Sequence, residues 1–229
     1  MFPGSVSAVG AVRRTIWGRI LRWLIALALL PVCIGTTWAL VDLLSLVGRS
    51  SQFWVPVLVG ATCWWVIFLS LPKPMWLYVV GHELTHALWA LLCGGKVKKF
   101  RATARGGHVV VTKTNLLITL SPYFFPLYAV LWTLFFLLGN ALFGWRPWLP
   151  WFHFGLGLAY AFHVTLTAHI LRTRQPDLES EGWVFSAVVI WLGNALTLLI
   201  ALPLLTRVMP LMKALGWAVN RIGRVLSAF

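Results

Sequence analysis

The chain has 229 residues, of which 60% are hydrophobic and only 10% are charged. A soluble domain usually carries about 25% charged residues, so this composition excludes an ordinary soluble protein and predicts an integral membrane protein. The formal net charge of +14 does not indicate nucleic-acid binding, because the basic residues lie at the ends of apolar segments, where they are expected to contact anionic lipid headgroups.

Six apolar segments are each long enough, or nearly so, to cross a hydrocarbon core of about 30 Å as a helix. They comprise residues 23–41, 53–71, 75–95, 116–139, 151–171 and 183–206. The expected fold is an all-α polytopic membrane protein with about six transmembrane helices in a single domain, residues 23–206. A basic N-terminal segment, residues 1–22, precedes this domain. Residues 207–229 form an amphipathic tail, which predicts a helix lying either on the membrane surface or against the bundle.

Residues 96–114 differ from the apolar segments on either side. They are rich in basic and β-branched residues and contain Gly106-Gly107. This pattern predicts a short β-hairpin with strands near 97–104 and 108–113 and a turn at the glycine pair. A strand edge cannot stay unpaired in lipid, so the hairpin is expected at the interface or in a protein-lined cavity.

The third apolar segment contains the sequence His82-Glu83-Leu84-Thr85-His86. On a helix, His82 and His86 are one turn apart on the same face, where two imidazoles can bind one zinc ion. Glu83 is rotated from His82 by about 100°, and it can hold a water molecule and accept its proton as the catalytic base. An ionisable side chain in hydrocarbon costs at least about 2.5 kcal/mol, which favours a functional site over a polar cluster satisfied by neighbouring helices.

A catalytic zinc usually has three protein ligands and one open position. Asp177 follows Pro176 in the polar loop before the last apolar segment, and it is the favoured third ligand. Glu179, Glu181 and, after them, His169 are the alternatives. The remaining histidines are interpreted as interfacial or packing residues; they are His108, His153 and His163.

The sequence GHELTHALWALLCGG at residues 81–95, followed by the predicted hairpin, resembles the site-2 protease family of intramembrane zinc metalloproteases, in its compact bacterial form without a PDZ domain. The resemblance extends over residues 81–113 and, more loosely, over 115–200. It implies that an aspartate from a later helical region completes the zinc site. The chain departs from the family at Thr85, where the family commonly has glycine. It also has Pro176-Asp177-Leu178 in place of the usual Leu-Asp-Gly.

The resemblance implies a zinc metalloendopeptidase of a bacterial inner membrane that cuts a peptide bond in or near a transmembrane segment of another membrane protein. The alternative is a catalytically inactive relative that assembles with or regulates partner membrane subunits. In the protease interpretation, the hairpin edge at Val109, Val110 and Val111 is expected to bind substrate; the alternative is that the hairpin is a purely structural flap. An extended substrate strand paired there would have its exposed amides satisfied.

Overall fold

The computed structural model describes residues 16–228 and the backbone of residues 5–8. Arg13 and Arg14 of the basic N-terminal segment, and Phe229 of the tail, lie outside the described residues. The chain is mostly helical and divides into two compact units, residues 1–9 with 51–176 and residues 10–50 with 177–229. Such units can belong to one folding domain, so the single domain over residues 23–206 stays a prediction.

Among the described residues, three helices are long and apolar enough to cross a membrane: α1 (Ile16–Val47), α2 (Ser51–Ser70) and α8 (Trp183–Thr206). Only 28%, 17% and 28% of their most apolar stretches are buried within the protein. Most of their apolar side chains therefore face outward, which is favourable when the surroundings are lipid. This outward-facing apolar surface is consistent with an integral membrane protein.

The fourth apolar segment is broken rather than merely kinked. Helix α4 (Leu116–Leu120) and the short 3-10 helix η1 (Ser121–Tyr123) are bent by 82° from α5 (Leu127–Phe143). Pro122 and Pro126 lie at this break, where proline removes a helical hydrogen bond. The two parts count as one further span if the bent pair crosses the membrane as a unit.

The expectation of six spans is not supported. Helices α3 (Met75–Leu92) and α6 (Leu149–Ile170) are long enough, but they are not among the candidate spans. Polar residues lower their mean hydropathy. In α3 these are chiefly His82, Glu83 and His86, and in α6 they include three histidines. The described residues therefore support three spans, or four with the bent pair.

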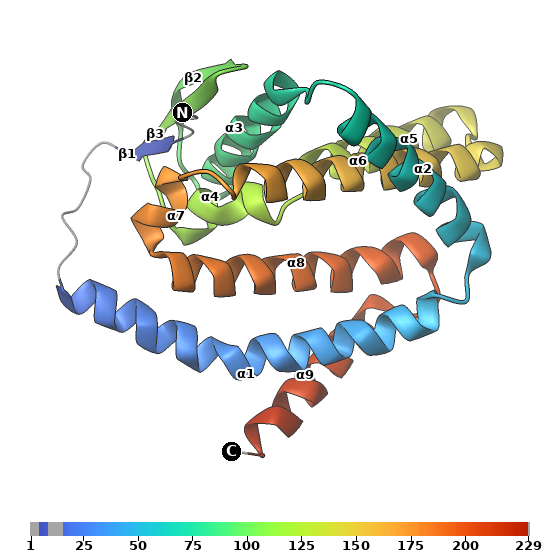
Figure 1. Cartoon of the computed structure of the whole chain (residues 1–229). Helices are drawn as coiled ribbons and strands as arrows, with labels where there is room; N and C mark the ends of the chain where they lie inside the picture. The colour runs from blue at the N-terminus through green and yellow to red at the C-terminus, as the bar shows by residue number, and fades with distance from the viewer. Residues whose placement is uncertain (1–4, 9–15, 229) are drawn as a thin grey trace. The chain divides into compact units, whose positions relative to one another are not determined.

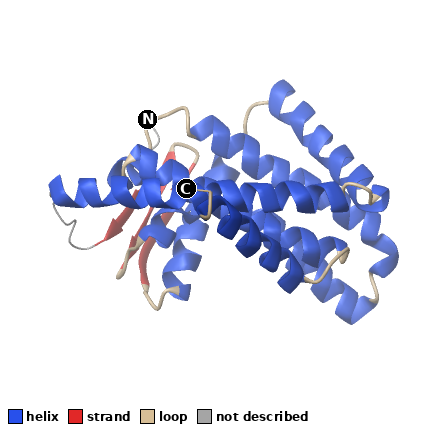
Figure 2. Cartoon of the chain, turned by 90° about the horizontal axis from the view of Figure 1, so that it is seen from below, coloured by secondary structure: helices blue, strands red, loops and turns tan. Residues whose placement is uncertain are grey.

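The first unit contains a small three-stranded sheet in the order β1-β3-β2 (red in Figure 2). Strands β2 (Val97–Thr103) and β3 (Gly106–Val111) form the predicted antiparallel hairpin. Its turn lies at residues 104–105 and not at the glycine pair, because Thr103 already pairs with Gly106. Strand β1 (Ser5–Ala8) pairs with β3 in parallel.

The sheet packs against α3 through alternate residues of β3. Val109 and Val111 are fully buried in a cluster with Ala87 and Ala90 of α3 and with Ile118 of α4. This cluster holds β3 beside the helix that carries the His-Glu-x-x-His sequence.

Helices α2 and α6 of the first unit pack with their backbones in contact. A Cβ added at Gly60 of α2 would lie 1.9 Å from the carbonyl oxygen of Phe154, and one added at Gly157 of α6 would lie 2.0 Å from that of Val57. Small residues allow this close approach, as is common between membrane helices. The 3-10 helix η2 (Arg146–Trp148) connects α5 to α6.

The second unit contains α1, most of α7 (Pro176–Glu181), α8 and α9 (Leu211–Leu226). Helices α1 and α8 run side by side, and α9 crosses α1 (Figure 1). At Gly35 of α1, a Cβ would lie 2.6 Å from the Cα of Ile222 in α9. The amphipathic tail is therefore a helix that packs on α1, with Ala214 and Ala218 buried. This agrees with the second interpretation of the tail.

Candidate metal centre

Helix α3 brings the two histidines of the motif together. The Nε2 atoms of His82 and His86 lie 3.2 Å apart, and their rings meet edge to face with centroids 4.8 Å apart. Both side chains are buried. The four-residue spacing on one helical turn therefore presents two imidazole nitrogens to the same point.

The ring of His86 is oriented by the broken fourth segment. Its Nδ1 lies 2.7 Å from the carbonyl oxygen of Ile118 in α4. A carbonyl only accepts hydrogen bonds, so Nδ1 carries the proton and Nε2 keeps its lone pair. Asn115 helps to fix the backbone at this residue, because its Oδ1 accepts a hydrogen bond from the Ile118 N–H at 2.9 Å. Such carbonyl-held imidazoles are typical of metal ligands.

His82 is enclosed by aromatic rings. Tyr123 of η1 meets it edge to face at 5.3 Å between centroids, and Tyr78 lies 5.8 Å away on the preceding turn of α3. These contacts limit the rotation of the imidazole. The ring is therefore positioned by packing as well as by the helix.

Asp177 completes a group that can hold a metal ion. Ligand atoms of His82, His86 and Asp177 all lie within 4.8 Å of one another, and all three residues are buried. The sequence favoured this set, and the structure brings it together. The alternatives Glu179, Glu181 and His169 are not part of the group.

The residue before Pro176 helps to position the aspartate. Gln175 is buried, and its Nε2 donates to the carbonyl of Ile170 at 3.1 Å and to Thr173 Oγ1 at 2.8 Å. Its Oε1 accepts a hydrogen bond from the Tyr123 hydroxyl at 3.5 Å. Asp177 follows two residues later in the same chain, so these bonds restrict where its carboxylate can lie.

Of the residues considered as alternative third ligands, Glu181 forms an ion pair with Arg22 at 3.1 Å.

Glu83 is fully buried and lies against the start of β3. A Cβ added at Gly107 would be 2.6 Å from Glu83 Cγ and 2.9 Å from Oε1. Because Gly107 has no side chain, the Glu83 side chain occupies space that the Cβ of any other residue would fill. The sequence predicts this glycine in the hairpin turn, and its contact with Glu83 is not apparent from the sequence. A glycine pair beside a hairpin turn gives the same local pattern in either case.

His163 is a second residue whose place the sequence did not indicate. It is buried in α6 and lines a cavity of about 20 Å³ together with His82, Thr85 and Tyr128. A cavity of this size holds about one water molecule. A histidine within an apolar segment was the available signal, although such a residue is also typical of side-chain packing.

The expected substrate edge is already occupied. Strand β3 is the central strand, and Val109, Val110 and Val111 pair with residues 6–8 of β1 on one side and with β2 on the other. The expectation of an unpaired hairpin edge at these residues is therefore wrong. Residues 5–8 lie about 100 positions from β3 in the chain, and no local pattern predicts such a pairing. The side chains of Val109 and Val111 also lie in the core, whereas Val110 is only partly buried.

Comparisons of the chain with family models, with curated proteins and with solved structures found no match. The interpretation of the site therefore depends on its own residues and geometry.

Proposed function

We propose that the protein is an intramembrane zinc metalloprotease, as its resemblance to the site-2 protease family implies, and that it acts in a bacterial inner membrane. The observation that carries this proposal is the buried group of His82, His86 and Asp177, with Glu83 directly beside it in the same helix. Its substrate would be another membrane protein, cut in or near a transmembrane segment.

The donor set fits zinc. Two imidazoles and one carboxylate are a usual ligand set of catalytic zinc. With metal–nitrogen distances of about 2.0–2.1 Å and tetrahedral angles, two such nitrogens lie about 3.3 Å apart. The Nε2 atoms of His82 and His86 are 3.2 Å apart. Zinc held there would polarise a peptide carbonyl and lower the pKa of a water molecule toward about 7.

Glu83 has the role of the general base in this proposal. Its carboxylate lies one residue from His82, on a helix, and it is shielded from solvent. It would accept a proton from the attacking water and return it to the leaving amine of the cut peptide bond. Gly107 leaves room for the carboxylate in this position, because a larger residue there would collide with it.

The substrate is proposed to bind as an extended strand along β3, in the place that β1 occupies. The β1 pairing supports this, since it indicates that the edge at Val109, Val110 and Val111 accepts an extended backbone. A helix shields its amides behind its own hydrogen bonds, so a substrate segment must unwind before it is cut. Pairing with β3 would satisfy the amides thereby exposed.

The alternative is an inactive metal-binding subunit with an assembly or regulatory role. Thr85, where the family commonly has glycine, favours this alternative. Its hydroxyl donates to the carbonyl of Gly81 at 2.7 Å within α3 and is buried. The buried hydroxyl of Thr85 therefore has its hydrogen-bond partner within α3.

The experiment compares the wild-type protein with Glu83→Gln and with the double variant His82→Ala/His86→Ala. Zinc in the detergent-purified proteins is measured by elemental mass spectrometry. New protein N-termini are measured by peptide mass spectrometry in bacterial membrane vesicles that contain each variant. We expect about one zinc per wild-type chain, the same content in Glu83→Gln, and loss of zinc in the double histidine variant.

New N-termini that depend on Glu83 would support the protease. Zinc retained by wild type and Glu83→Gln, with identical N-termini in both, would support the inactive subunit instead. Zinc content that does not change in the double histidine variant would refute the metal site itself.

A further inference from the structure

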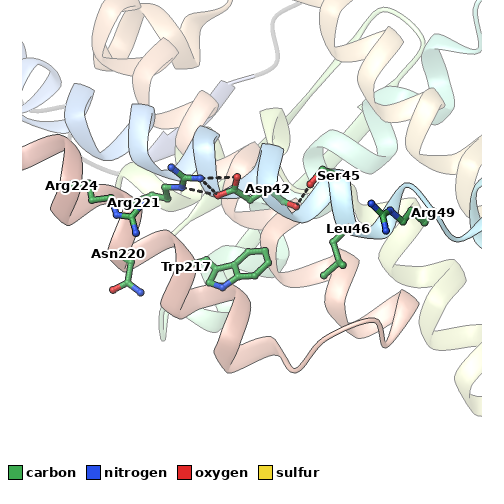
Figure 3. A pocket seen from close by; sticks show the side chains of 8 residues that line it. All are labelled: Asp42, Ser45, Leu46, Arg49, Trp217, Asn220, Arg221 and Arg224. Atoms are coloured by element: carbon green, nitrogen blue, oxygen red, sulfur yellow. Dashed lines mark hydrogen bonds and ion pairs between the residues drawn. The ribbon is translucent and has the colours of Figure 1, made fainter.

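The second unit contains an open pocket of about 530 Å³ that is separate from the metal-binding residues. It lies between the end of α1 and the helix α9, and the residues that carry the argument are Asp42, Arg49, Trp217, Asn220, Arg221 and Arg224 (Figure 3). Three of these are arginines, and one is an acid. No part of the proposed protease mechanism uses them.

One of the arginines is neutralised by the acid. Arg221 donates to Asp42 through two hydrogen bonds, from Nε to Oδ2 at 2.7 Å and from Nη2 to Oδ1 at 2.8 Å. This two-bond geometry connects α9 to α1. In the part of the chain that the structure describes, Arg49 and Arg224 form no ion pair. The pocket is therefore left with two positive charges that an anion could neutralise.

The pocket lies at the end of a candidate membrane span. Helix α1 is apolar and ends at Val47, and Arg49 follows two residues later. On the turns before the pocket, Trp38 and Val41 are 54% and 49% exposed, so large apolar side chains face outward there. The chain thus changes from lipid-facing apolar residues to arginines within about two helical turns, as at the boundary between hydrocarbon and headgroups.

Helix α9 has the composition of an interfacial helix at the same level. Met212 and Val219 are 76% and 68% exposed, although the buried face of α9 packs on α1. The Trp217 indole lines the pocket, and tryptophan is enriched where membrane meets water. The exposed apolar residues of α9 would contact lipid around the pocket.

We propose that this pocket binds the phosphate of an anionic glycerophospholipid. A guanidinium donates two parallel hydrogen bonds to phosphate oxygens, which makes arginine a preferred phosphate ligand. Arg49 and Arg224 supply this chemistry from α1 and α9, and the Asn220 amide can donate to a headgroup hydroxyl or ester oxygen. The acyl chains would lie along the exposed apolar residues of α1. The proposal does not depend on the protease function.

The affinity of the detergent-purified full chain for phosphatidylglycerol is measured by native mass spectrometry, with phosphatidylcholine and inorganic phosphate as comparison ligands. We expect phosphatidylglycerol to bind more tightly than either. Arg49→Gln and Arg224→Gln should each weaken its binding about tenfold, since each removes a charge-assisted contact. Arg146→Gln is the matched control, because Arg146 is an exposed arginine of η2 outside the pocket, and it should bind as the wild type does.

A second variant tests the sign of the charge that the pocket prefers. Asp42→Asn removes the carboxylate, so Arg221 becomes available to the ligand and phosphatidylglycerol should bind as tightly as before or more tightly. Thermal unfolding, measured in parallel, shows whether the variant is folded. Weaker binding by a folded Asp42→Asn protein would overturn the proposal.

Three other results would also overturn it. Equal affinity for phosphatidylcholine would mean that the lipid charge is not recognised. An equal loss of affinity in Arg146→Gln would mean that the effect comes from the total charge of the protein. Inorganic phosphate that binds as tightly as the lipid would identify a free anion as the ligand.

Discussion

Replacing Gly107 by alanine tests whether the position of Glu83 matters separately from the metal ligands. The added Cβ would lie 2.6 Å from Glu83 Cγ and 2.6 Å from the carbonyl oxygen of Arg101. An ordinary contact between carbon atoms is about 3.5 Å, so the groups must separate by about 0.9 Å. The Arg101 carbonyl belongs to the β2 backbone, so the Glu83 side chain is the group expected to move.

A displacement of about 1 Å at a catalytic group can reduce the rate about a hundredfold. We therefore expect Gly107→Ala to lower the Glu83-dependent production of new N-termini by about that factor in membrane vesicles. Zinc content should be unchanged, because the atoms nearest to the added Cβ belong to Arg101 and Glu83 and not to the three proposed ligands. The overpacking should also lower the free energy of unfolding by about 1–3 kcal/mol.

Gly216→Ala is the matched control, since a Cβ at Gly216 of α9 meets nothing within 4 Å. It should leave activity and zinc unchanged. Wild-type activity in Gly107→Ala would show that the position of Glu83 does not limit catalysis. Loss of zinc together with activity would show that Gly107 supports the fold rather than the base.

Three further predictions concern the ligand, the strand and the packing. Asp177→Ala should weaken zinc binding at least about a hundredfold, because loss of a residue that merely hydrogen-bonds to a metal ligand already costs about 10–100-fold in affinity. Glu179→Ala should leave the zinc affinity unchanged; a zinc titration in which Glu179→Ala binds more weakly than Asp177→Ala would exclude Asp177 as the ligand. If β1 occupies the substrate edge, Val6→Pro or Ser7→Pro should increase the cleavage rate several-fold, because proline has no N–H to donate and so weakens the pairing of β1 with β3. Slower cleavage by both variants, with zinc retained, would show that β1 is required for activity. Gly60→Ala should lower Tm by several degrees because its Cβ would lie 1.9 Å from the Phe154 carbonyl oxygen, and each 1 kcal/mol lost from the free energy of unfolding lowers Tm by about 2–4 °C at this chain length. A Tm equal to that of Gly216→Ala would contradict the close packing of α2 on α6.

The grouping of the candidate ligands was largely predictable from the sequence. His82 and His86 lie four residues apart, so any helix that contains them brings their imidazoles together. Asp177 required a different argument, namely that it follows a proline in a polar loop of a chain with five acidic residues. The structure adds what spacing cannot give. It shows that Gln175 is hydrogen-bonded to Ile170 and Tyr123, which restricts the position of the aspartate.

The number of spans was less predictable, because the six segments were identified mainly by their length, whereas mean hydropathy separates the more polar helices from the candidate spans. Helix α3 has the length of a span, and its site residues make it less apolar than α1 or α8. A similar ambiguity affected Gly106-Gly107, where a turn and a close approach to Glu83 give the same local sequence. For the glycine pair, the missing information was the contact of Gly107 with Glu83, a residue distant in the chain.

The broken fourth segment and the polar helix α3 depend on each other. The carbonyl of Ile118, before the break, orients His86 at 2.7 Å, and Tyr123, at the break, packs on His82. Pro122, directly before Tyr123, and Phe125, two residues after it, line the small cavity beside His82. A continuous apolar helix from 116 to 143 would cross lipid more favourably, because every backbone group would bond within it. The broken segment lacks this continuous bonding, and its residues instead orient one imidazole and pack against the other.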